Sequence, residues 1–159
     1  MLGPVADIHT TPVLIHEENI KQVEAYRYLG VWIDKTLSWR DHIDVISMQI
    51  IYFLHRLRSF GARKQILLLF FMSVIMSVLQ YCNSVWYMSL SVSLKTKLMN
   101  LLEMCSKIVG QPLQKVYELS YHNNLVRLAN NIVSEPNHVL YNEFVLLPSN
   151  RRYKVPRYS

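Results

Sequence analysis

Residues 26–42 read Tyr-Arg-Tyr-Leu-Gly-Val-Trp-Ile-Asp-Lys-Thr-Leu-Ser-Trp-Arg-Asp-His, and this stretch decides the fold. Strand-forming residues run up to Tyr28-Leu29-Gly30, and a second short run, Val31-Trp32-Ile33, ends at Asp34. Two such runs separated by a glycine-containing turn are typical of a β-hairpin. The sequence therefore predicts a hairpin over residues 26–34.

A helical pattern follows the hairpin directly. Ser38 is placed to cap a helix that begins at Trp39, and Asp41 is placed to close a capping box with it. Apolar residues then recur every three or four positions, which is one stripe of an amphipathic helix. Gly61 is expected to end this helix. The stripe consists of Trp39, Ile43, Ile46, Ile50, Phe53, Leu57 and Phe60.

Three more helices are expected downstream. One runs from Ala62 to at least Gln80 and at most to Tyr87, one is capped by Ser91 or Ser93 and stops at Gly110, and one covers 116–133 with a break near His122-Asn123-Asn124. The predicted fold class is therefore mainly α, a helical bundle preceded by a short β-hairpin. We expect residues 1–37 to be a palm remnant with the hairpin, 38–134 a helical thumb-like bundle, and 135–159 an extended basic tail. Residues expected among the central contacts are Leu68, Phe71, Ile75 and Leu79.

Composition favours a folded chain with a polyanionic partner. Of 159 residues, 51% are hydrophobic and only 18% charged, which is enough apolar material for a core. The net charge of +6 favours nucleic acid or an anionic membrane surface. Two cysteines, Cys82 and Cys105, are too few for a disulfide framework. With no recognisable signal peptide at the N-terminus, an intracellular protein, nuclear or cytoplasmic, is expected.

A membrane anchor is an alternative that the middle of the chain raises. No charged residue lies between Lys64 and Lys95, a stretch longer than the roughly 20 residues that span a bilayer. Its strongly apolar part covers only Ile66 to Leu79, and several serines follow. A buried helix is therefore the favoured interpretation, and a small membrane-anchored protein is the minority one.

Basic residues form two groups. The first flanks the break between the first two predicted helices, and the second ends the chain, interleaved with tyrosines. Clustered Arg and Lys neutralise phosphates, and Tyr stacks on bases, although the same residues also occur on solvated helix corners and frayed ends. The candidate nucleic-acid-binding residues are Arg56, Arg58, Arg63 and Lys64 in the first group and Arg151, Arg152, Lys154 and Arg157 in the second.

Catalytic motifs are sparse. His42-Ile43-Asp44 matches the His-x-Asp half of an iron and 2-oxoglutarate oxygenase triad, with His122 or His138 as the distal ligand. Two positions apart on a helix, however, the pair points in different directions. With 4 glycines there is no Gly-rich phosphate loop, and the adjacent carboxylates of a polymerase site do not occur. We expect no metal, no cofactor and no catalysis by the chain alone.

The order of several sequence pieces resembles LINE-type (non-LTR) retrotransposon reverse transcriptases, in the segment after the palm. The pieces follow the hairpin over most of the chain: Leu54-x-x-Leu57-Arg58-Ser59-Phe60-Gly61, Lys64 to Phe70, Ser77-Val78-Leu79-x-Tyr81, Val85-Trp86-Tyr87, Ser106 to Gly110, and Leu146-Leu147-Pro148-Ser149-x-Arg151-Arg152-Tyr153. Asn150 stands where the family has Gly, which is typical of a decayed copy.

The resemblance implies a function. In that family the hairpin is the primer grip and the following helices form the thumb, so Tyr28, Leu29 and Gly30 become primer-grip-like residues. The chain would hold RNA and DNA non-specifically, without catalysis, beside a missing palm domain. The same segment also resembles the N-terminal domain of AlkB-type alkylation-repair homologues. That alternative links it to methyltransferase and 2-oxoglutarate oxygenase activity.

Overall fold

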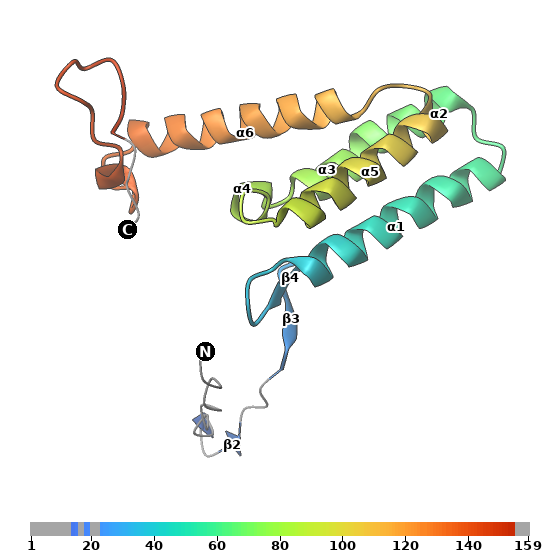
Figure 1. Cartoon of the computed structure of the whole chain (residues 1–159), viewed down its shortest axis with the longest axis horizontal. Helices are drawn as coiled ribbons and strands as arrows, with labels where there is room; N and C mark the ends of the chain where they lie inside the picture. The colour runs from blue at the N-terminus through green and yellow to red at the C-terminus, as the bar shows by residue number, and fades with distance from the viewer. Residues whose placement is uncertain (1–13, 16–17, 20–22, 155–159) are drawn as a thin grey trace, which may run out of the picture.

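The computed structural model describes residues 14–15, 18–19 and 23–154. The chain is mainly α-helical, with short antiparallel hairpins before the helices, so the predicted fold class is confirmed (Figure 1). In order, the elements are β1 (Leu14–Ile15), β2 (Glu18–Asn19), β3 (Ala25–Tyr28), β4 (Val31–Asp34), α1 (Arg40–Ser59), α2 (Lys64–Phe70), the π-helix η1 (Phe71–Ile75), α3 (Met76–Gln80), α4 (Asn83–Trp86), α5 (Val92–Val109), α6 (Gln114–Ser134) and the 3-10 helix η2 (Tyr141–Glu143).

The hairpin β3–β4 forms where the sequence predicts it. Leu29 and Gly30 make its two-residue turn with φ of 47° and 89°, the sign pattern of a type I′ turn. This turn fixes the register, so that Arg27 lies opposite Trp32. Opposed residues project from the same face of a hairpin, and these two therefore share one face.

The predicted capping box between Ser38 and Asp41 is wrong, because the Ser38 backbone N that it needs donates to Asp34. One Asp34 carboxylate oxygen accepts from the backbone N of Ser38 at 3.0 Å and from both the N and the Oγ1 of Thr36, at 2.9 and 2.6 Å. The other accepts from Ser38 Oγ and from the backbone N of Trp39, both at 2.9 Å. Trp39 is held at a left-handed φ of 63°, and α1 starts one residue later than expected.

The core lies between three helical segments. In Figure 1, α5 runs between α1 and the α2–α3 segment, and it packs against both α1 and α2. Phe71, Ile75 and Leu79 are buried there as predicted, whereas Leu68 is half-buried at the edge. Other buried residues are Ile43, Ile50 and Leu54 of α1, Leu67 of α2, and Leu98, Leu101, Leu102 and Cys105 of α5.

The second predicted helix is not one regular helix. A π-turn interrupts it at 71–75, and it stops at Tyr81, whose backbone is extended, and Cys82, whose φ is 52°. The five-residue π-turn adds a residue to the helical repeat and rotates the helix after it. Met76 is therefore buried while Val74 and Val78 remain exposed.

The third helix begins and ends where predicted. Ser91 Oγ accepts from the backbone N of Leu94 at 3.4 Å, and Gly110 ends α5 with a φ of 82°. The fourth helix, α6, is unbroken over 21 residues, so the break expected at 122–124 is wrong. Among the helices described, none combines the length and hydropathy that a membrane crossing needs.

Candidate nucleic-acid interface

The first predicted basic group gathers at the corner between α1 and α2. Arg56 and Arg58 lie in the last turn of α1, Arg63 is the N-cap of α2, and Lys64 is its first residue. A tight connection holds them together: Gly61 N donates to Arg58 O at 3.0 Å, and Gly61 has a φ of 78°. The four exposed cations therefore lie on one short segment at the end of the helical layer, and we call them the basic corner.

None of the four has an acidic partner in the described part of the chain. The ion pairs found there join Lys97 to Asp44 at 2.7 Å and Lys107 to Glu103 at 2.8 Å. Arg56 stands over the Phe60 ring, with 5.0 Å between Cζ and the ring centroid. Cations at the end of α1 also complement its dipole, so a binding role has to be separated from a stabilising one.

The second basic group lies on a small loop after α6. Leu147 N donates to Arg152 O at 2.8 Å and Lys154 N to Val145 O at 2.7 Å, so the chain turns back on itself here. Arg151 and Arg152 are exposed in the turn. Arg157 lies outside the described residues.

The two basic groups are at opposite ends of the molecule. The basic corner joins α1 to α2, whereas the loop with Arg151 follows the far end of α6 (Figure 1). A helix of 21 residues is about 30 Å long, so this separation is large compared with one phosphate contact. The structure does not bring the two groups together.

The primer-grip-like residues lie at the opposite end of α1 from the basic corner (Figure 1). Tyr28 and Leu29 are exposed at the tip of the β3–β4 hairpin. Gly30 faces the end of α3, because a Cβ placed on it would lie 3.8 Å from Tyr81 Cε1. The hairpin tip therefore rests beside the end of α3.

His42 and Asp44 have separate surroundings on α1. His42 is buried, and its ring meets Trp86 edge to face with 5.4 Å between centroids. Asp44 forms the ion pair with Lys97 at the surface. His138, one candidate distal ligand, accepts a hydrogen bond from Leu140 N at its Nδ1. Within the described ranges no group of three or more His, Cys, Asp or Glu is placed to hold a metal ion.

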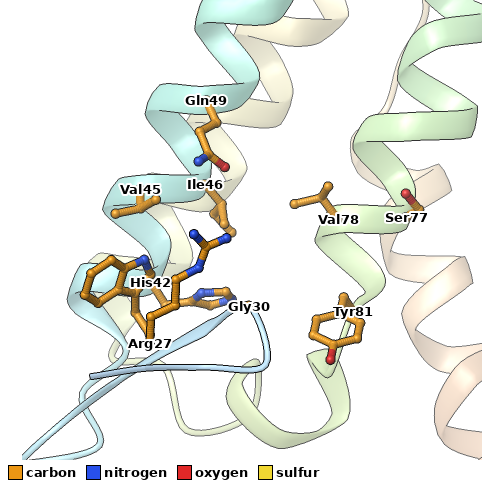
Figure 2. A pocket seen from close by; sticks show the side chains of 10 residues that line it. Arg27, Gly30, His42, Val45, Ile46, Gln49, Ser77, Val78 and Tyr81 are labelled. Carbon is orange, nitrogen blue, oxygen red and sulfur yellow. The ribbon is translucent and has the colours of Figure 1, made fainter. Parts of the chain in front are cut away.

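A hollow of about 410 Å³ opens between the hairpin, α1 and α3 (Figure 2). Its lining includes Arg27 and Trp32 of the hairpin, His42 of α1 and Tyr81 after α3. None of these four residues belongs to the predicted nucleic-acid or primer-grip sets. Only Arg27 and Trp32 can be paired from the sequence, because the turn at Leu29-Gly30 places them on one face of the hairpin. The approach of α3 is a tertiary feature.

Burial shifts the pKa of His42 and of Cys105, a core residue of α5. It lowers the pKa of His42, which keeps the imidazole neutral at pH 7, and it raises the pKa of Cys105 to about 12. A thiol held protonated in the core is a poor nucleophile. Cys105 is therefore a packing residue of α5.

The chain matches no protein-family model, no curated protein and no solved structure. The resemblances to retrotransposon reverse transcriptases and to AlkB-type homologues stay predictions from the sequence.

Proposed function

We propose that the chain is a non-catalytic nucleic-acid-holding domain, a thumb and primer-grip fragment of a retrotransposon reverse transcriptase. The observation that carries the proposal is the basic corner. Four exposed cations without an acidic partner in the described part of the chain crowd one helix junction, and clustered cations of this kind attract phosphates. The partner is RNA or DNA, read through its backbone and not its bases.

Two further features support this function. The net charge of +6 adds a long-range attraction for polyanions. The ordered sequence pieces from the hairpin to Arg152 resemble the corresponding retrotransposon segment. In such a polymerase a palm domain supplies the chemistry.

The test is the salt dependence of binding to a fluorescent RNA–DNA hybrid, measured by anisotropy. Affinity should fall steeply as salt rises, because bound phosphates release counterions. Replacing Arg58 and Arg63 by Gln should reduce the slope of log affinity against log salt by about 0.9 for each phosphate that the variant no longer binds. A scrambled hybrid should bind equally well.

A matched control removes the same charge elsewhere. Lys35 and Arg127 are also exposed and lie outside the basic corner, so replacing both by Gln tests the effect of net charge alone. We expect this variant to keep nearly the wild-type slope. Equal salt slopes for the two double variants would show that the basic corner does not contact phosphates. Absence of binding at low salt would refute the proposed function.

A further inference from the structure

The hollow beside the hairpin has a chemistry distinct from that of the basic corner. It lies at the other end of α1, where the β3–β4 face, the first turns of α1 and the end of α3 meet (Figure 2). Its volume of about 410 Å³ falls in the range of small-ligand sites. The charge, ring surfaces and shape of its lining each restrict the ligands that it binds.

The charge of the lining selects an anion. Arg27 is the only charged residue among those that line the hollow, with His42 neutral. Its side chain is exposed, has no ion pair within the described residues, and points along α1 toward Gln49 (Figure 2). A guanidinium that makes no hydrogen bond to another described residue matches a phosphate in both geometry and charge.

The walls of the hollow offer flat apolar surfaces. Trp32 stands opposite Arg27 in the hairpin, on the same face, and Tyr81 approaches from the end of α3. Trp86 Nε1 donates a hydrogen bond to Tyr81 O at 3.0 Å, which fixes the backbone that carries the phenol ring. Aromatic rings in a lining stack on nucleobases with little regard for sequence.

His42 is the buried floor of the hollow. Only 3% of the residue is exposed, and neither ring nitrogen has a hydrogen-bond partner within the described residues. Because burial lowers its pKa, the imidazole is neutral and carries one donor and one acceptor. Both ring nitrogens have almost no accessible surface, so His42 closes the floor of the hollow and gives it shape rather than a hydrogen bond to an occupant.

We propose that this hollow binds a single unpaired nucleotide of a nucleic-acid strand, with its phosphate on Arg27 and its base against Trp32 and Tyr81. The inference rests on the proposed function, because it states which part of a bound nucleic acid lies in the hollow beside the hairpin. It adds a base contact to a protein whose basic corner contacts only phosphates.

The test compares two duplexes of equal length and charge. One ends in a single unpaired nucleotide, and in the other that nucleotide is abasic. Wild-type protein should bind the first about tenfold more tightly in an anisotropy titration, because its unpaired base stacks on the aromatic walls. Tyr81→Leu should remove this preference. Tyr26→Leu is the matched control, because Tyr26 is exposed and lies on the other face of the hairpin.

Arg27→Gln separates the phosphate from the base. It should weaken binding of the intact and the abasic duplex by the same factor and leave their ratio unchanged. Circular dichroism melts show whether each variant folds. If Tyr81→Leu does not fold, the site is tested with wild-type protein and a duplex that carries fluorescent 2-aminopurine as its unpaired base. Its fluorescence should be quenched on binding by the aromatic walls, and unchanged fluorescence overturns the proposal.

The outcomes distinguish the inference from the function on which it rests. Equal affinity for intact and abasic duplexes, with a steep salt slope for both, overturns the nucleotide site and leaves the proposed function standing. A base preference that survives Tyr81→Leu and is lost in Tyr26→Leu also overturns the site. Failure of both duplexes to bind at low salt overturns both proposals.

Discussion

At the scale of single residues, Asp34 organises the passage from the hairpin to α1. Its carboxylate accepts five hydrogen bonds from three residues, Thr36, Ser38 and Trp39. These bonds, led by that from the Thr36 hydroxyl, lower the pKa of Asp34 well below its usual range. The ionised form is therefore the one that stabilises the junction.

Replacing Asp34 by Asn should lower the free energy of unfolding at pH 7 by about 2 kcal/mol, the upper part of the range for losing a capping side chain. An amide nitrogen cannot accept the bonds that one carboxylate oxygen accepts. Urea denaturation followed by circular dichroism measures the change. Asp41→Asn is the control, because Asp41 accepts no capping hydrogen bond from any residue that the structure describes. A change above about 1 kcal/mol there would contradict the assignment.

The pH dependence of the same residue has a definite sign. The pKa of Asp34 is lower in the folded state than in the unfolded chain, where it is about 4. Ionised Asp34 therefore stabilises the fold fully above about pH 4, and this stabilisation is lost as the pH falls below that value. The stability difference between wild-type protein and Asp34→Asn should therefore be constant from about pH 5 to 7. It should shrink below about pH 4, and urea denaturation over a pH series measures it.

At the scale of elements, the π-turn at 71–75 sets the faces of the α2–α3 segment. Leu67 precedes the π-turn, Phe71 opens it, Ile75 ends it and Leu79 follows it. These four residues are spaced by four, and all of them are buried. A regular α-helix has 3.6 residues per turn, so residues spaced by four shift in one direction around the helix axis at each step. The extra residue of the π-turn absorbs this drift.

Deleting Ser73 should convert the π-turn into regular α-helix and preserve the buried face. Ser73 is exposed, and its Oγ donates only to Leu69 O. The variant should fold with a loss of no more than about 1 kcal/mol, as for an exposed change. Deleting Ser77, in the regular helix α3, should instead rotate Leu79 out of the core and cost roughly 2–5 kcal/mol. Thermal melts compare the two deletions, and equal losses would contradict this role of the π-turn.

At the scale of the whole molecule, α6 leads away from the rest of the bundle (Figure 1). Its first half is anchored by Tyr117 and Tyr121, whose rings lie 5.7 and 4.4 Å from that of Tyr87, and by a hydrogen bond from Gln80 to Ser120. Between 122 and 131 its side chains are exposed or only half-buried.

Amide hydrogen exchange should therefore divide α6. Amides at 124–131 should exchange at least roughly tenfold faster than those of Leu98 to Cys105 in α5, because local opening exposes little apolar surface there. Exchange measured by mass spectrometry on the whole chain tests this. Equal protection in the two segments would show that a partner or a second copy covers this part of α6.

Much of the fold can be predicted from the sequence because its signals are local. The turn at Leu29-Gly30, the serine cap at Ser91 and the helix end at Gly110 each need only a few neighbouring residues. The basic corner belongs to the same class, since its four residues are close together in the chain. Such features follow from backbone preference and from helical periodicity.

Other features depend on competition and contacts that no short segment contains. The sequence predicted a capping box between Ser38 and Asp41, but the backbone N of Ser38 donates to Asp34 instead. His42 occurs in the sequence as a polar helix residue, and only the approach of Trp86 and Tyr81 makes it the buried floor of a hollow. By itself the sequence determined a hairpin, the helical bundle and a cluster of cations, because periodicity, caps and charge are local properties. Tertiary structure alone decided the π-turn, the hollow and the distance between the basic groups, because they depend on how distant segments pack.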